Sequence, residues 1–293
     1  MAYKISDKAI IIESGGETIL VAESFQYEDS ITILNTDFTL SPTYISDYFP
    51  TPPVQGSISG HSVGGYPPVS PNGPNNSIDK FSFVSDANAT DVGDVLQSSL
   101  KNSAGTSTLS DGYISGGSSS PVSPPYSDVN QNVIQKFSFA SGGNTTDVGD
   151  LSSTTSQNSG LTDKSGDQSF IYQSKYPYAT TSYLKFPFAT GVGASAGTVL
   201  YHKSSKSEQV SATHGYTTGG KNVPPAGDVS IEKFAFASDG DGTDVGDMSF
   251  DTYGAGGTES ENHGYTFGGV IPSPYSFYDN IDKINELYIE LIN

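Results

Sequence analysis

Alternating apolar and polar residues mark the clearest elements of this chain. The pattern Ile-x-Lys-Phe-x-Phe occurs three times, at residues 78–83, 134–139 and 231–236. Successive side chains of a strand point to opposite faces, so the two Phe side chains share one face and the Ile side chain lies on the other. Each copy therefore predicts a short strand with apolar residues on both faces, in a sheet that is covered on both sides.

The same segment follows each copy of this strand. Thr-Asp-Val-Gly-Asp stands at residues 90–94, 146–150 and 243–247, each time after a run of turn-forming residues. Such a run predicts a hairpin that leads into a returning strand. A diverged copy of the Lys-Phe strand at residues 183–188 and a last copy at residues 281–284 bring the period to about 50 residues. A β-type repeat of this length indicates sheets that bury their faces only against neighbouring sheets.

A strand that ends in a Gly pair precedes four of the five Lys-Phe strands, as at residues 214–220 and 263–269, and residues 169–175 align with it only loosely. Together with a Gly- or Ser-rich segment before it, this makes four short strands in each unit. We therefore expect an all-β fold, a propeller of about five four-stranded blades. The last unit ends after the strand around Lys283 without a Thr-Asp-Val-Gly-Asp strand, which would leave an unpaired edge.

The repeats divide the chain into residues 1–50, which lie outside them, and a propeller domain at residues 51–293. Three apolar stretches of the first segment are candidate strands: residues 9–12, 18–22 and 31–34. We expect one of them to close the ring. Because the segment holds more strands than closure needs, a small docking element and a sixth, divergent blade are the alternatives.

Charge and composition exclude several classes of partner. The chain has 13 Lys and no Arg against 32 Asp and Glu, a net charge of −19. Nucleic acids and anionic membrane surfaces are bound by clustered cations, so we expect neither as a partner. Cys is absent, which excludes disulfides and zinc sites of the cysteine type. The first residues lack the apolar core of a signal peptide, so we expect synthesis in a reducing cytoplasm without secretion.

A candidate metal site lies in the turn at residues 239–247. Asp239, Asp241 and Asp244 alternate with Gly residues, as oxygen ligands do in calcium loops. The equivalent turns at residues 86–91 and 142–147 lose carboxylates and keep the spacing. This favours a hairpin turn in which carboxylates accept hydrogen bonds from backbone N–H groups. We expect no cofactor.

Catalytic motifs find little support. Residues 60–64, Gly-His-Ser-Val-Gly, imitate a nucleophile elbow but lie inside a repeat strand with no helix after it. Residues 191–197 resemble a nucleotide loop by composition alone, and we interpret them as a loop that has diverged from the Thr-Asp-Val-Gly-Asp segment. The remaining catalytic possibility is a glycoside hydrolase, in which the fold would bring two carboxylates together.

Variable loops rich in Pro and Tyr connect the Gly-pair strand to the Lys-Phe strand. Tyr on rigid loops, among Ser, Gly and Asn, is typical of adaptable binding surfaces, and its ring stacks on sugars. A polar loop stiffened by Pro is the simpler interpretation. The loop aromatics that we expect to bind a ligand are Tyr66, Tyr126, Tyr176, Tyr178 and Tyr275.

Two resemblances follow from these motifs. The aromatic-x-x-Gly-Gly element at residues 265–269 resembles the double glycine of kelch repeats, although the chain has no Trp. Residues 231–247 and 263–269 resemble repeats in structural proteins of marine bacteriophages such as cyanophages. The resemblance covers most of the chain from about residue 57 onward and implies a fibre, spike or head-surface protein.

On this basis we expect a non-enzymatic virion protein, present in many copies, whose propeller mediates adhesion to a host-surface glycan or protein. Residues 1–50 would attach it to other virion proteins. A purely structural role in head decoration, or as a tail or neck accessory, is the alternative. A carbohydrate-active enzyme is the second alternative.

Overall fold

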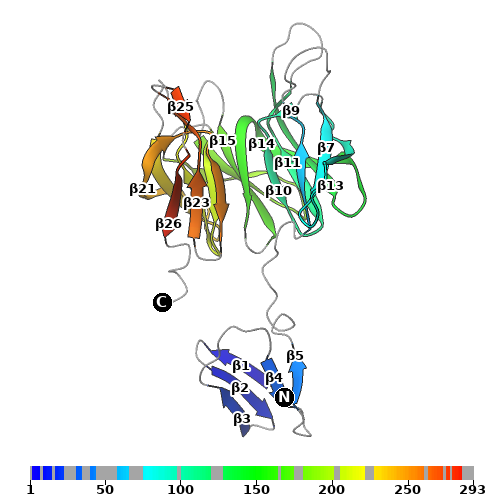
Figure 1. Cartoon of the computed structure of the whole chain (residues 1–293), viewed down its shortest axis with the longest axis vertical. Coiled ribbons are helices and arrows are strands. Elements are labelled where there is room, and N and C mark those ends of the chain that lie inside the picture. The colour runs from blue at the N-terminus through cyan, green and yellow to red at the C-terminus, as the bar shows by residue number, and fades with distance from the viewer. Residues whose placement is uncertain are drawn as a thin grey trace. The chain divides into compact units, whose positions relative to one another are not determined.

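The computed structural model divides into two compact units, Met1–Thr51 and Pro52–Asn293 (Figure 1). In the first unit it describes the backbone of five strands. In the second it describes residues 58–65, 75–97, 100–119, 128–163, 166–174, 181–200, 205–221, 228–260, 263–272, 275–277 and 279–285. The described residues hold strands, turns and bends, and none of them forms a helix that could cross a membrane.

The first unit contains an antiparallel meander and a hairpin. β1 (Ala2–Ser6), β2 (Ala9–Ser14) and β3 (Glu17–Ala22) pair in sequence order. β4 (Ile31–Leu34) pairs with β5 (Leu40–Thr43). The three apolar stretches predicted to be strands lie in β2, β3 and β4. That one of them closes the ring stays a prediction.

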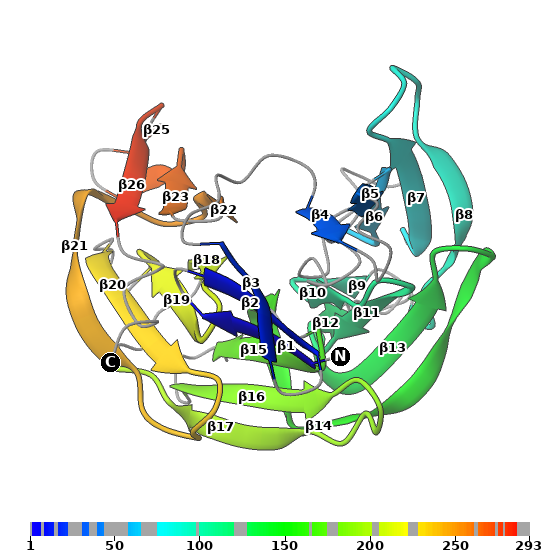
Figure 2. The same cartoon turned by 90° about the horizontal axis from the view of Figure 1, so that it is seen from below.

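Five antiparallel sheets make up the second unit and are arranged as a propeller, which confirms the predicted fold class and the count of five blades (Figure 2). We number these blades 1 to 5 in chain order. Their strands are β6 (Ser59–Val63), β7 (Ser77–Ser82) and β8 (Thr90–Asp94) in blade 1; β10 (Ala104–Ser107), β11 (Asp111–Ser115), β13 (Val129–Ser138) and the first part of β14 (Gly142–Thr162) in blade 2; the rest of β14, β15 (Gln168–Ser174), β16 (Thr181–Pro187) and β17 (Ala194–Thr198) in blade 3; β18 (Ser207–Val210), β19 (His214–Thr218), β20 (Asp228–Ala235) and β21 (Thr243–Thr252) in blade 4; and β22 (Gly256–Glu259), β23 (His263–Phe267) and β26 (Ile281–Asn285) in blade 5.

The number of strands differs between the middle and terminal blades. Blades 2, 3 and 4 have the four predicted strands, whereas the described residues provide three in blade 1 and three in blade 5. Blade 5 lacks a partner for β26 on its outer side in the described residues, as the missing Thr-Asp-Val-Gly-Asp segment predicted. Four short strands complete the described structure: β9 (Leu100–Lys101) pairs with β12 (Ser118–Ser119), and β24 (Val270–Pro272) with β25 (Tyr275–Phe277).

One prediction about blade 3 is wrong. Residues 191–197 were expected to form a loop, but residues 194–198 are the outer strand β17. Gly197 lies opposite Tyr183 and has a positive φ of 140°. The other three outer strands carry a Gly at this register position with φ between 150° and 159°. The fold has therefore kept the strand, although its Asp-Val-Gly-Asp signature has been lost.

The register of the Gly-pair strand on the Lys-Phe strand is the same in all five blades. A small residue faces the first ring of the Phe pair, as Gly112 faces Phe137 and Gly215 faces Phe234. A Cβ on Gly112 would lie 2.4 Å from the Phe137 ring, and one on Gly215 would lie 2.3 Å from the Phe234 ring. The ring thus lies flat over its neighbouring strand, which explains the Gly before the aromatic residue in the repeat.

Apolar contacts between adjacent blades bury the core. In blades 2, 3 and 4 the Phe pair packs on the ring that follows this small residue in the preceding blade: the ring centroids of Tyr113 and Phe188 are 4.5 Å apart, and those of Phe170 and Phe236 are 4.9 Å apart. Successive side chains of the Lys-Phe strand point to opposite faces, so its Ile side chain contacts the following blade. Each fully buried Phe or Ile contributes about 1.5–3 kcal/mol, so these interfaces hold the propeller together.

Polar side chains also connect adjacent blades. The residue after the Ile in the Lys-Phe strand points toward the preceding blade. Asp282 of blade 5 accepts hydrogen bonds from the backbone N–H and the hydroxyl of Ser249 in blade 4. Glu232 of blade 4 is fully buried and pairs with Lys206, which lies on the connection from blade 3. Buried charges require such partners, so this position contributes to the fit between neighbouring blades.

Candidate functional site

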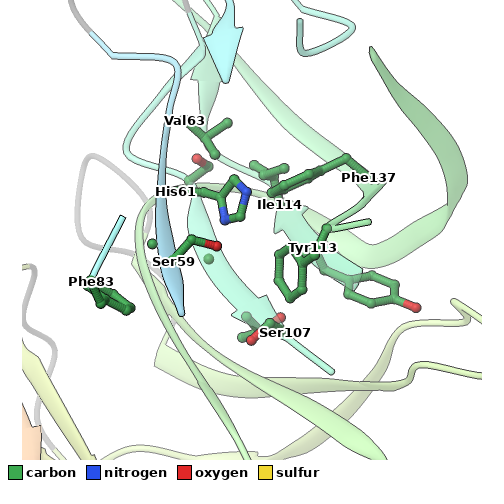
Figure 3. Close-up of a pocket in the computed structure, with 14 residues that line it drawn as sticks. Ser59, His61, Val63, Phe83, Ser107, Tyr113, Ile114 and Phe137 are labelled. Atoms are coloured by element: carbon green, nitrogen blue, oxygen red, sulfur yellow. The ribbon is translucent and has the colours of Figure 1, made fainter. Parts of the chain in front are cut away.

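A cavity of about 450 Å³ lies between blades 1 and 2, bounded by β6 on one side and by β10 and β11 on the other (Figure 3). Aromatic groups form much of its wall: His61, Phe83, Tyr113, Phe137 and Phe139. Ser59, Ser103, Thr106 and Ser107 add hydroxyl groups. The cavity thus combines ring faces with hydrogen-bonding groups, as small-molecule sites do.

The repeat explains why a cavity forms at this interface. His61 occupies the position that holds a larger ring in the other blades: Tyr113, Phe170, Tyr216 and Tyr265. In addition, β6 pairs with β7 on one side and has no strand on its other edge in the described residues. In blade 2, that edge of the equivalent strand β11 is covered by β10. A smaller side chain and an open strand edge therefore coincide in blade 1.

The His61 imidazole is held by two aromatic rings. It stacks on Phe139 with the ring centroids 5.0 Å apart, and it meets Phe137 edge-on at 5.2 Å. Burial lowers the pKa of His61 below its ordinary value, and the ammonium of Lys80 lowers this pKa further. The ring is therefore neutral at pH 7, with one nitrogen able to donate and the other able to accept a hydrogen bond. It lies inside the cavity near Ser59 (Figure 3).

A second hollow of about 510 Å³ adjoins this cavity, and the two share Val63 and Ser103. Its wall includes Lys101 and Asp128, whose charged groups are 2.9 Å apart. The side chain of Lys101 is 15 % exposed and that of Asp128 is 47 % exposed. An extended ligand could therefore contact aromatic rings at one end and an ion pair at the other.

The composition of the wall sets what this site can do chemically. Among the described residues that line the 450 Å³ cavity there is no carboxylate, so a glycosidase pair of Asp or Glu does not lie among these residues. Ring faces, hydroxyls and a neutral imidazole can bind a polyhydroxylated molecule without reacting with it. The wall thus offers groups for noncovalent binding.

The structure does not test the predicted loop aromatics as a binding surface. Tyr66, Tyr126, Tyr176 and Tyr178 lie outside the described residues, and only the backbone of Tyr275, in β25, is described. His61 was given no role by sequence reasoning. An alignment of the repeats could have identified it, because His61 is the one imidazole at a position where every other repeat has Tyr or Phe.

The three carboxylates of the calcium candidate have separate protein partners. Asp239 pairs with Lys185 of blade 3. Asp241 accepts hydrogen bonds from the Thr198 hydroxyl and from its backbone N–H at 3.0 Å. These two bonds, the hydroxyl first, hold the pKa of Asp241 below its ordinary value. Asp244 accepts the N–H of Gly246 at 3.1 Å.

The repeat shows that two of these contacts are structural. Asp91 and Asp147 accept the N–H of the residue two positions on, as Asp244 does. The amide oxygen of Asn144 accepts the backbone N–H of Asp94 in the preceding blade, as Asp241 does with Thr198. An uncharged amide serves as well as a carboxylate at that position. These contacts explain why the spacing is kept where the charge is lost.

We predict that calcium does not stabilise the propeller. Addition of millimolar Ca²⁺, or of a chelator, should leave the thermal midpoint unchanged, because protein groups already satisfy the carboxylates in the turn at residues 239–247. Differential scanning calorimetry of the full chain measures this. A midpoint that rises with Ca²⁺ and returns to its original value in the Asp241→Asn variant would show that the turn binds the ion.

Comparisons with known proteins agree with the fold. No protein-family model matches the chain, and no curated protein matches it. Among solved structures, the structure of YjhT is similar, with a TM-score of 0.60 and 10% sequence identity, covering 77% of this chain and 82% of that one. At this identity the similarity concerns the arrangement of the sheets alone.

Proposed function

We propose that this chain is a non-enzymatic binding module of a bacteriophage particle, and that the cavity between blades 1 and 2 holds a sugar ring of a host-surface glycan. The observation that carries the proposal is the wall of that cavity. It joins aromatic rings and hydroxyls to the neutral imidazole of His61, which stacks on Phe139, and no described residue of its lining carries a carboxylate.

Each part of a sugar has a matching group in this wall. The C–H face of a pyranose packs against aromatic rings, which Tyr113 and Phe139 provide. Its hydroxyls form hydrogen bonds in two directions, and both His61 and Ser107 can donate and accept. A single site of this kind binds weakly, but display in many copies on one particle multiplies the effective affinity.

The assignment to a phage particle rests on the repeats. Their kelch-like Gly pair and the Lys-Phe strands resemble those of marine phage structural proteins. In this proposal residues 1–50 attach the module to other virion proteins, and the propeller faces the host surface. The acidic surface, with a net charge of −19, keeps a protein that is present in many copies soluble.

His61→Phe tests the site directly. Phe170 shows that a phenyl ring fits this position of the repeat and packs on the Phe pair of the next blade. The variant should therefore keep the thermal midpoint of the wild type while losing the ring nitrogens. We expect about tenfold weaker binding to the oligosaccharide that the wild type selects from an array of bacterial surface glycans, the effect of one lost hydrogen bond.

Four results would contradict the proposal or narrow it. Equal glycan binding by the wild type and by His61→Phe would exclude the cavity as the glycan site. Failure of the wild type to bind any glycan or host cell would favour the purely structural role. Electron microscopy that places the chain on the head lattice would support that role as well. Release of free sugar from the bound glycan would identify an enzyme.

A further inference from the structure

The outer face of blade 5 exposes residues that are buried in every other blade. Ile281 is 69 % exposed, whereas the equivalent Ile78 and Ile134 are 0 % exposed because the next blade covers them. Phe267, on the same face, is 42 % exposed. Tyr265 occupies the position of Tyr113, the ring on which the following blade packs its Phe pair. Blade 5 therefore presents the face that receives a further blade.

Blade 1 exposes the opposite half of the same contact. Phe81 is 38 % exposed and Phe83 is 59 % exposed, whereas Phe137 and Phe234 at the first position of the pair are 5 % and 3 % exposed. The rings of Phe81 and Phe83 are 5.5 Å apart and nearly perpendicular, like those of Phe137 and Phe139 at 5.6 Å. The pair is thus already arranged as it is at the internal interfaces.

The outer faces of blade 5 and blade 1 also carry opposite charges at the positions of an ion pair between internal blades. Between blades 3 and 4, Lys185 pairs with Asp239 of the next turn. Lys283 of blade 5 holds the position of Lys185 in its strand, and Asp86 of blade 1 holds the position of Asp239 in its turn. Both Lys283 and Asp86 are exposed. A blade 5 face that meets a blade 1 face would bring these opposite charges together.

We propose that these two faces join copies of this chain, blade 5 of one copy packing on blade 1 of the next. The contact repeats the one that holds adjacent blades together: Ile281 and Tyr265 receive Phe81 and Phe83 as Ile134 and Tyr113 receive Phe186 and Phe188. Because the two faces differ, the association is head-to-tail and forms a row or a ring of copies. Of the residues in this contact, Phe83 also lies in the wall of the cavity proposed as the glycan site, whereas Phe81, Tyr265 and Ile281 do not.

Two single variants test the proposal. Phe83→Lys places a charge on the apolar face of blade 1, and Ile281→Lys places one on the apolar face of blade 5. Both positions are exposed, so we expect both variants to fold. The wild type should show a mass that increases with concentration in sedimentation velocity. Each variant alone should remain a single chain, with self-association weakened about tenfold or more by the loss of a buried apolar side chain. An equimolar mixture of the two variants should form dimers and nothing larger, because one intact pair of faces remains.

Leu109→Lys is the matched control, since Leu109 is also 69 % exposed but lies away from both faces. It should associate as the wild type does, and circular dichroism should show the same strand content in all variants. A wild type that stays a single chain at all concentrations overturns the proposal, and the two faces would then be covered within one chain. Dimers formed by either variant alone would overturn it too, because they would require a symmetric interface.

Discussion

Lys206→Met is expected to lower the free energy of unfolding by about 3–5 kcal/mol, the cost of leaving a buried charge without its partner. The ammonium of Lys206 donates to Glu232 at 2.5 Å and to the Thr217 hydroxyl at 3.3 Å, and the side chains of Lys206 and Glu232 are both 0 % exposed. Burial lowers the pKa of Lys206, while Glu232 acts in the opposite direction. Met keeps the aliphatic stem over the Tyr172 ring, where the ammonium lies 4.8 Å from the centroid. Urea denaturation of the full chain measures the change.

The repeat offers a matched control for this pair. Leu184 stands in blade 3 where Glu232 stands in blade 4, and it is buried in the apolar core. The double variant Lys206→Met with Glu232→Leu should therefore recover most of the stability that the single variant loses, because an apolar pair leaves no buried charge. A double variant that is as unstable as the single one would show that the shape of the site, rather than its charge, decides the stability.

Gly149→Ala is expected to destabilise the protein by about 3 kcal/mol or more, through strain and overlap together. Gly149 has φ 151°, where side chains are strained, and a Cβ there would lie 2.0 Å from the carbonyl oxygen of Gly191 in the next blade. Neither backbone can move without separating blades 2 and 3. The same urea denaturation measures the loss.

Gly246→Ala separates the two causes. Gly246 holds the same position in blade 4 with φ 150°, but a Cβ there would meet nothing within 4 Å. This variant should lose only the strain energy, about 1–3 kcal/mol. If both variants lose the same amount, the close approach of neighbouring blades does not contribute to the specificity of the fold, and the positive φ of this position alone requires Gly.

The strands that the sequence predicts correctly are those whose side chains repeat. The alternation of Ile78, Phe81 and Phe83 fixes two faces, and the structure places Ile78 toward blade 2 and the Phe pair on the opposite face. Phe137 and Phe234 hold the same register positions in their blades. Because the period reveals which faces must be covered, it also predicts the propeller.

The sequence conceals features that depend on neighbouring backbone or on missing neighbours. Residues 151–162 belong to a Ser-rich segment that predicts a separate short strand, but β14 runs through them without a break from the outer strand of blade 2 because β15 pairs with its second part. The cavity beside His61 exists because β6 lacks a second partner in the described residues and because blade 2 brings Phe137 and Phe139 to the ring. Neither fact can be read from the spacing of motifs. The repeat could still have shown that His61 departs from the Tyr and Phe of its equivalents.

The 21 residues of β14 make blades 2 and 3 share one uninterrupted strand. Its first part is the outer strand beside β13, and its second part is the inner strand beside β15. Because β14 is continuous between these two blades, we expect them to unfold as one cooperative unit. We expect a pulling force that enters through either blade to be carried along this strand into the other, so that the middle of the propeller resists extension more than a pair of blades joined by a loop would.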